Sequence, residues 1–216
     1  YTGRKHIIRG EYHGWHEWTT AAESVRQGGI LPEVRKFIHK FDYNDLAKVE
    51  EYFVAYPGEV AAVITEAVEV EPPKDGFLEN LKELCHRNGA LLIFDEVVNG
   101  FRFSIGGAQA YFGVTPDLST FGKATANGMP LSIVAGRKDI MEEVDRNVFI
   151  STTFGGECLS LAAGIAVMKE LESGEATKKI WAKGKYLQDK FRAMAKDLDV
   201  PIDLAGYPCR LNLEYT

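Results

Sequence analysis

Asp95 and Lys123 are the two residues whose side-chain types and positions could carry out chemistry together. Asp95 ends an apolar run (residues 90–94), and Lys123 follows a second strand-like run (residues 118–121). A short run that is apolar on both faces is typical of a buried strand in a parallel sheet. Ligands of open α/β sheets lie beyond the carboxyl ends of the strands, where both residues fall. A pyridoxal-phosphate site needs such a pair, because the lysine forms a Schiff base and the acid pairs with the pyridinium nitrogen.

Both residues also have plainer interpretations. A lone lysine is usually a solvated surface charge, and an acid after a strand can cap a helix. Lys123, however, follows an apolar run and stands next to Gly122. Val97 and Val98 are poor first-turn residues, which weakens the interpretation of Asp95 as a helix cap. We expect Lys123 to be buried among neutral groups, which would lower its pKa and make it a usable nucleophile.

The elements that would position these residues alternate along the chain. Amphipathic helices are predicted over residues 45–56 and 76–88, and buried strands over residues 60–64 and 91–94. This succession predicts an α/β fold, with a mostly parallel sheet flanked by helices and joined by right-handed crossovers. Shorter strands are expected at residues 6–8 and 131–136, and further helices at residues 106–113, 138–144, 158–172 and 176–198.

Composition limits the class of protein. The chain has 216 residues, of which 45% are hydrophobic, enough for the core of one domain or slightly more. A net charge of −6 gives no basic footprint for nucleic acid, and no apolar run is long enough to span a membrane. Three cysteines without a C-x-x-C motif argue against a disulfide framework or a thiolate metal site. With no visible signal peptide, a cytoplasmic enzyme is the default expectation.

An aromatic, histidine-rich loop occupies residues 11–17. His13 and His16, flanked by acids, could bind a metal, but H-x-x-H lacks the helical i, i+4 spacing of established zinc motifs. We therefore expect no metal site. Tyr12 in the same loop could be an ordinary core aromatic or a ligand contact.

Four motifs give the chain a recognisable pattern: FDEVVNGFR, GAQAYFGVTPDL, FGKATANGMP and STTFGGECLSLAAG. In this order they resemble the class-III, fold-type I pyridoxal-phosphate aminotransferases and the related glutamate-1-semialdehyde aminomutases. The resemblance covers nearly the whole chain, but the chain does not cover the whole family. It implies a central fragment of the large domain, which begins after a Ser-Gly-Thr-Glu-Ala-like phosphate loop. Residues 1–172 would form the cofactor-binding domain, and residues 173–216 a linker helix and the start of a small α+β domain.

The resemblance assigns roles around the cofactor ring. Lys123 would be the Schiff-base lysine and Asp95 the partner of the pyridinium nitrogen. Residues 12–14 resemble a Y-H-G element next to the cofactor, in which Tyr12 would stack on the ring and His13 would be a further cofactor-binding residue. Val97 would pack on the opposite face.

Other roles implied by the resemblance lie further from the ring. Thr153, or failing that Thr152, would reach the phosphate of a neighbouring subunit's cofactor, so a homodimer with shared active sites is implied. Glu66 matches an acid near the cofactor, although it could also be solvated. Arg102 is expected to be structural, and residues 19–39 to form a surface excursion near the substrate entrance.

The acidic stretch after the predicted strand 60–64 suggests a further hypothesis about substrates. Glu66, Glu69 and Glu71 could repel carboxylate-rich substrates or attract amino-bearing ones.

The implied reaction is transfer of an amino group from a small amino donor to a carbonyl acceptor. Intramolecular amine exchange, as in the aminomutases, is the alternative. It is disfavoured by residues 126–128 (Ala-Asn-Gly), where aminomutases tend to have a glycine run, and by residues 153–157, where they tend to have Gly-Asn-Pro. A third possibility is a fragment that cannot retain the cofactor.

Overall fold

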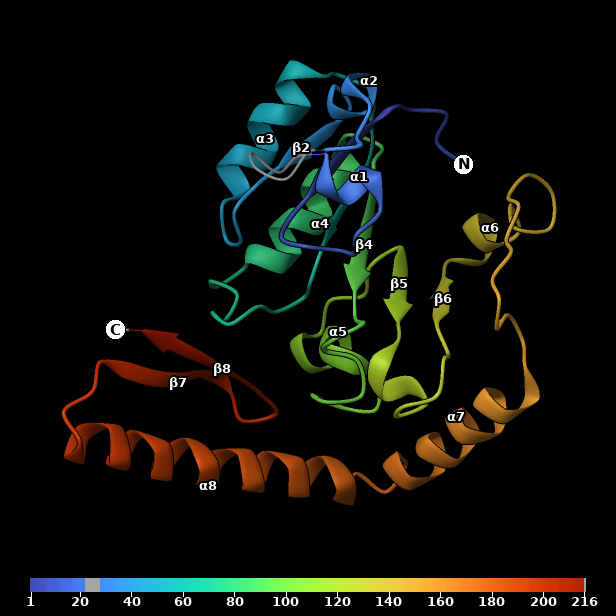
Figure 1. Ribbon diagram of the computed structural model, residues 1–216. Coiled ribbons are helices and arrows are strands. Elements are labelled where there is room, and N and C mark those ends of the chain that lie inside the picture. The colour runs from blue at the N-terminus through green and yellow to red at the C-terminus, as the bar shows by residue number, and fades with distance from the viewer. Residues whose placement is uncertain (22–27, 216) are drawn as a thin grey trace.

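A six-stranded sheet forms the body of the protein in the computed structural model, which describes residues 1–21 and 28–215 (Figure 1). Its strands are β1 (His6–Arg9), β2 (Ile38–Lys40), β3 (Val60–Thr65), β4 (Leu91–Asp95), β5 (Leu118–Phe121) and β6 (Ile133–Gly136). They lie in the order β2-β1-β3-β4-β5-β6. All neighbours pair in parallel except β6, which runs antiparallel to β5. The predicted mostly parallel sheet is therefore confirmed.

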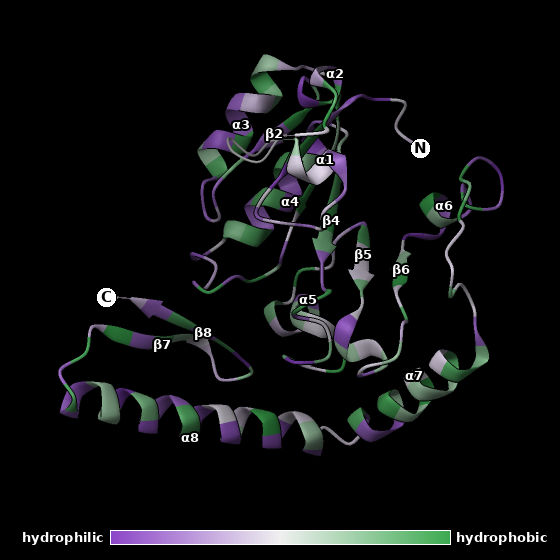
Figure 2. Ribbon diagram, viewed as in Figure 1, coloured by the Kyte–Doolittle hydropathy of each residue, from purple (hydrophilic) through white to green (hydrophobic). Residues whose placement is uncertain are grey.

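Two amphipathic helices pack on this sheet, close to their predicted bounds. They are α3 (Leu46–Ala55) and α4 (Phe77–Arg87). The Asp45 side chain caps α3 by accepting a hydrogen bond from Lys48 N at 3.0 Å. The apolar face of α4 is buried in one hydrophobic cluster with β3 and β4, and Figure 2 shows the hydrophobic character of β4. The apolar residues at helical spacing that predicted the two helices therefore also form the faces that the helices bury.

The edge strand β2 was not predicted. Residues 19–39 were expected to form a surface excursion, but Ile38 pairs with Ile7 of β1 and is buried. The strand is only three residues long and carries His39 and Lys40, so it lacks the apolar run that marks the central strands. Short helices α1 (Glu17–Thr20) and α2 (Pro32–Arg35) precede it, and residues 22–27 lie outside the described part of the chain.

Most of the second half of the chain lies toward the end of the sheet to which β4 and β5 point, but the antiparallel β6 leads back to the other end (Figure 1). Its elements are α5 (Gly107–Phe112), the 3-10 helix η1 (Lys123–Thr125), α6 (Lys138–Met141), α7 (Cys158–Leu171), α8 (Glu175–Asp197), β7 (Ile202–Tyr207) and β8 (Arg210–Tyr215). Strand β6 and helix α6 are shorter than the segments predicted for them. None of the helices in residues 1–21 and 28–215 is both long and apolar enough to cross a membrane.

The antiparallel β7–β8 hairpin is fixed to α8 and, through it, to the sheet. Gln188 of α8 donates to Leu204 O at 2.9 Å, which joins the helix to β7. Trp181 of α8 donates its indole N–H to Arg102 O at 3.2 Å, in the loop after β4. The Phe103 ring packs edge-on against Trp181 and Tyr207. Arg102 itself donates to Val98 O at 2.8 Å, consistent with the expected structural role.

Asp117 organises the opposite end of the sheet, where the chain enters β5. Its buried carboxylate accepts hydrogen bonds from Leu92 N at 2.8 Å, Arg137 Nη1 at 2.9 Å and His86 Nε2 at 3.0 Å. Burial raises the pKa of Asp117, but these hydrogen bonds outweigh burial and hold the pKa below its ordinary value. The carboxylate therefore joins β4, α4 and the segment after β6.

We expect Asp117→Asn to destabilise the fold in a pH-dependent way. The folded-state pKa of Asp117 lies below the unfolded value of about 3.9, so its stabilisation is present above that value and is lost as pH falls through the folded pKa. The variant should lose about 2–4 kcal/mol at neutral pH, and the difference should narrow in acid. Urea unfolding across the pH range measures this. Asp139→Asn, which removes an exposed partner of Arg137, is the control, and an equal loss at every pH would contradict the argument.

Candidate active site

The register of β4 and β5 brings the two predicted reactive residues to one edge of the sheet. Asp95, the last residue of β4, pairs with Thr120 of β5, and the Glu96 N–H donates to Thr120 O at 2.8 Å. Lys123 follows β5 after one residue, Gly122, and is the first residue of η1. Because the strands are parallel, both residues lie at carboxyl ends, which point the same way in Figure 1.

The Asp95 carboxylate is held by three hydrogen bonds. His13 Nδ1 lies 2.8 Å from Oδ2, while Val97 N and Thr120 Oγ1 lie 2.9 Å and 3.3 Å from Oδ1. Burial raises the pKa of Asp95, but the hydrogen bonds from these residues lower it below the ordinary value. The carboxylate is therefore a fixed anion at neutral pH, able to pair with a cation such as a protonated ring nitrogen.

His13 is the neighbour that ties Asp95 to the loop after β1. Its side chain is only 1% exposed, and within the described part of the chain its Nε2 has no hydrogen-bond partner. Because the acceptor is ionised, Nδ1 carries the proton and donates. His16, by contrast, is exposed and stacks on Trp15 with ring centroids 4.7 Å apart. Among the described residues, no cluster of three or more His, Cys, Asp or Glu could hold a metal ion.

The expected burial of Lys123 is wrong: the residue is exposed. It lies beyond the end of β5 in a single turn of 3-10 helix, where the sheet no longer covers it. Its φ of +40° lies in the left-handed region, which residues other than glycine rarely adopt. Thr125 fixes the turn by donating to Gly122 O at 2.8 Å. Strained backbone of this kind is concentrated at functional sites.

Tyr12 and Val97, predicted to sit on the two faces of the cofactor ring, come from different loops. Tyr12 is 60% exposed, so the interpretation as a core aromatic fails. Val97 lies against the segment that leads to Lys123, because a Cβ added to Gly122 would be 3.4 Å from Val97 Cγ1. Both side chains are thus available beside the strand ends, while their contact with a ring stays a prediction.

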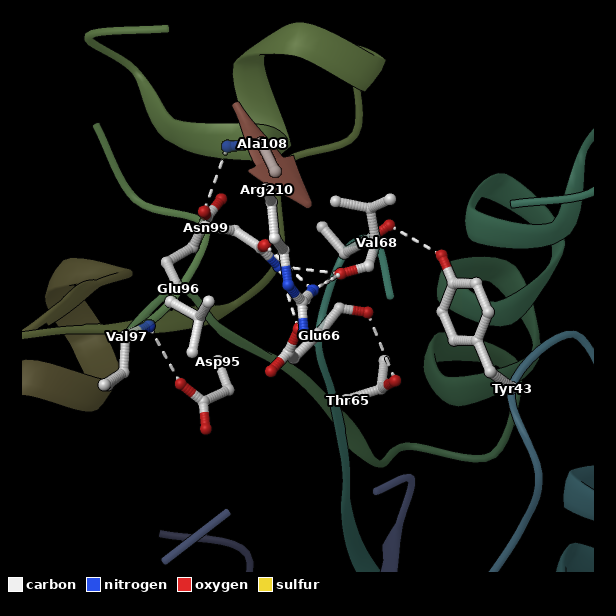
Figure 3. Close-up of polar contacts among 12 residues, drawn as sticks. Tyr43, Thr65, Glu66, Val68, Asp95, Glu96, Val97, Asn99, Ala108 and Arg210 are labelled. Atoms are coloured by element: carbon white, nitrogen blue, oxygen red, sulfur yellow. Dashed lines mark hydrogen bonds and ion pairs between the residues drawn. The ribbon is translucent and has the colours of Figure 1, made fainter. Parts of the chain in front are cut away.

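Glu66, after β3, is buried rather than solvated, and Figure 3 shows it beside Arg210 and Asn99. It forms an ion pair with Arg210 of β8 and accepts a hydrogen bond from Asn99 Nδ2 at 3.1 Å. Arg210 also donates to Asn99 Oδ1 at 3.0 Å and to Val68 O at 2.6 Å. Burial raises the pKa of Glu66, and the adjacent Arg210 opposes that rise. Glu66 is therefore held in a fixed position beside the candidate site.

Sequence reasoning missed Asn99 and Arg210. Asn99 stands in the N-G-F-R turn four residues after Asp95, so that motif could have indicated a buried amide. Arg210 lies 144 residues from Glu66 in the sequence, and no local pattern joins them. Only the docking of the β7–β8 hairpin brings the guanidinium to the sheet edge.

The three acids after β3 do not form one charged surface. Glu66 is buried and neutralised by Arg210, whereas Glu71 is exposed. Burial, followed by the charges of Glu11 and Glu66, raises the pKa of Glu69 to about 7. Glu69 therefore carries only part of a charge at neutral pH, which weakens the hypothesis of an acidic surface that selects amino-bearing substrates.

Thr153 is not brought to the Asp95 side chain. It lies exposed in the turn before α7, as does Thr152, and within the described ranges no hydrogen bond links either residue to Asp95 or Lys123. The residues at the strand ends could hold the ring of a cofactor, whereas the described residues do not assemble a phosphate site around them.

Comparisons with known proteins find similar sequences along most of the chain. A sequence model of the family Aminotransferase class-III matches residues 8–207. A 3-aminobutyryl-CoA aminotransferase from Cloacimonas acidaminovorans is 38% identical over 214 residues, covering 96% of this chain and 51% of that protein. A glutamate-1-semialdehyde 2,1-aminomutase from Nitratidesulfovibrio vulgaris is 38% identical over 229 residues, covering 98% of this chain and 52% of that protein.

Solved structures of known proteins also match the fold of this chain. The FumI protein of Sphingopyxis sp. MTA144, in its PLP internal aldimine form, matches with a TM-score of 0.90 and 26% identity, over 100% of this chain and 53% of that chain. An omega-transaminase from Sphaerobacter thermophilus matches with a TM-score of 0.85 and 26% identity, over 96% of this chain and 53% of that chain. The chain therefore spans about half the length of these relatives.

We expect Arg210 and Glu66 to be energetically coupled. Arg210→Gln leaves a buried carboxylate without its cation and should cost roughly 3 kcal/mol of unfolding free energy. Glu66→Gln removes the charge that needs compensation, so the double variant should be less destabilised than the sum of the single variants by about 1–3 kcal/mol.

Urea unfolding of the four proteins measures this coupling. The exposed Arg192–Asp203 pair joins α8 to the same hairpin and provides the matched control, with little coupling expected in Arg192→Gln and Asp203→Asn. Additive effects of the Arg210 and Glu66 substitutions would show that the pair does not hold the hairpin to the sheet.

Proposed function

Because the chain belongs to the class-III aminotransferase family, we propose that it binds pyridoxal 5'-phosphate and transfers an amino group between a small amino donor and a carbonyl acceptor. One observation carries the proposal. The Asp95 carboxylate is kept ionised by His13, Val97 and Thr120, and it lies on the strand next to β5, which leads to Lys123. The pair supplies a fixed anion and a primary amine at one sheet edge, as this cofactor requires.

The residues present fit the ring of this cofactor. Asp95 would hold the ring nitrogen protonated, and Val97 and Tyr12 would lie on its two faces. His13 would keep Asp95 oriented, and Glu66, fixed by Arg210 and Asn99, would form the adjoining wall. When bound, the cofactor supplies an electron sink that stabilises negative charge at the substrate Cα. The Lys123 Nζ would hold the cofactor and then carry the Cα proton to its new position.

We also propose a homodimer with shared active sites. The segment before α7 is exposed and apolar: Phe149 is 91% exposed and Ile150 64% exposed. Helix α7 carries further hydrophobic residues along its length (Figure 2). A second subunit would cover such a surface, and it would bring Thr153 to the phosphate of the partner's cofactor.

Amine exchange within one substrate is the second candidate. It is supported by the glutamate-1-semialdehyde aminomutase relative, whose 38% identity equals that of the aminotransferase relative. The departures at residues 126–128 and 153–157 favour transfer. A third candidate, a chain that cannot retain the cofactor, is supported by its coverage of about half of each relative. On this reading, residues 1–172 form an incomplete cofactor-binding domain, and residues 173–216 the linker and the start of a smaller one.

Borohydride reduction after incubation with pyridoxal phosphate should label Lys123 alone. The reduction fixes the cofactor to the amine that holds it, and peptide mass mapping locates the adduct. Lys123→Ala should abolish the label, and Lys138→Ala should leave it intact. Lys138 is also exposed, so it reports labelling by exposure alone. Labelling spread over such lysines would overturn the assignment, and no labelling at all would support the third candidate.

A panel of amino donors separates transfer from exchange. If the chain is a transferase, a donor alone should change the absorbance of the bound cofactor and release one equivalent of carbonyl product. A carbonyl acceptor added afterwards should restore the absorbance. If the chain catalyses exchange, the substrate should isomerise with no second substrate and no net release of a carbonyl product. Absorbance and product analysis on the same samples distinguish the two.

A further inference from the structure

Glu96, the residue next to Asp95, connects three elements around the candidate site. It is fully buried, and its carboxylate accepts backbone hydrogen bonds in α5, from Ala108 N at 3.0 Å (Figure 3) and from Gln109 N at 2.7 Å. Its own N–H donates to Thr120 O of β5 at 2.8 Å, and its carbonyl accepts from Gly100 N at 2.7 Å. One residue thus joins β5, the turn after β4 and the start of α5.

Two glycines make room for this arrangement. A Cβ on Gly107 would lie 2.7 Å from Glu96 Oε1, and Gly107 has a φ of +78°. A Cβ on Gly100 would lie 2.6 Å from the Glu96 carbonyl oxygen. Both distances are shorter than real Cβ contacts, so the close approach of α5 and the turn to Glu96 depends on glycine at these positions.

A carboxylate suits this position better than an amide. Its two oxygens each accept one N–H, whereas glutamine would offer one acceptor and direct an NH₂ group at the second donor. Burial raises the pKa of Glu96, and the hydrogen bonds from Gln109 and Ala108 oppose that rise.

The anchored turn is the one that holds Asp95. Val97 N, the next amide along, donates to Asp95 Oδ1 at 2.9 Å, and the Val97 side chain lies against the Gly122 segment. Successive side chains of a strand point to opposite faces, so Glu96 faces α5 while Asp95 faces the site. We propose that Glu96 is a positioning residue, which holds Asp95 and Val97 in place for the cofactor by fixing the turn after β4 to α5. The effect of Glu96 on cofactor binding rests on the proposed function, whereas its role in fixing the turn after β4 does not.

Three variants of the 216-residue chain isolate this role. Glu96→Gln keeps the shape and removes one acceptor. Gly107→Ala keeps the charge and displaces the carboxylate. Gln109→Ala is the matched control, because it removes the bond from Gln109 Nε2 to Ser119 Oγ but keeps the backbone N–H that binds Glu96. Circular dichroism verifies that each variant is folded.

Amide hydrogen exchange, read by NMR on the chain without cofactor, is the first measurement. Glu96→Gln and Gly107→Ala should speed exchange at Val97 by about tenfold, the loss of roughly one net hydrogen bond. Exchange at Leu92, which is bonded to Asp117 at the other end of β4, should not change. Gln109→Ala should leave both amides unchanged.

The dissociation constant of pyridoxal phosphate is the second measurement. It should rise about tenfold in Glu96→Gln and Gly107→Ala, but not in Gln109→Ala. Unchanged exchange at Val97, or equal acceleration at Val97 and Leu92, would overturn the positioning role. Failure of the unsubstituted chain to bind the cofactor would count against the proposed function and leave the exchange result standing, so the two failures can be told apart.

Discussion

The parallel pairing of β4 with β5 is the constraint on which the candidate site depends. Because Asp95 pairs with Thr120, the chain leaves both strands on the same side of the sheet, and the acid and the lysine emerge together. A shift of one residue would turn Asp95 to the opposite face and Glu96 toward the site. The hydrogen bonds from Glu96 N to Thr120 O and from Thr120 Oγ1 to Asp95 Oδ1 both depend on this register.

Buried charge is the second constraint, and the chain meets it with partners from distant segments. Glu66, Asp95 and Glu96 lie close together after β3 and β4, where the hydration that would stabilise them in water is lost. Each has a different kind of partner. Glu66 has a guanidinium, Asp95 an imidazole and an amide, and Glu96 two backbone N–H groups. Burial raises the pKa of all three acids; the hydrogen bonds to Asp95 outweigh burial and lower its pKa, whereas the partners of Glu66 and Glu96 do not, so the pKa of each stays raised.

Local periodicity was enough to predict the elements that position the site. Helices α3 and α4 and strands β3 and β4 were predictable because their burial follows 3.6-residue spacing or a continuous apolar run. Strand β2 was not, because three residues carry too little pattern. The exposure of Lys123 and the contact of Arg210 with Glu66 depend on how distant segments cover the sheet edge, which no window of sequence contains. The sequence was therefore enough to predict which residue types form the candidate site, but not the burial and contacts of those residues.

The ion pair between Arg210 and Glu66 has a consequence for synthesis of the chain on the ribosome. The two residues are 144 positions apart, so the sheet and its acidic edge emerge well before the strand that carries Arg210. During that interval Glu66 has no guanidinium beside it, and the edge of the nascent sheet should stay open to solvent. We expect Glu66 to gain its ion pair only when β8 is released from the ribosome, which protease sensitivity of stalled chains would show. The order of translation would therefore set the order in which the parts of the candidate site come together.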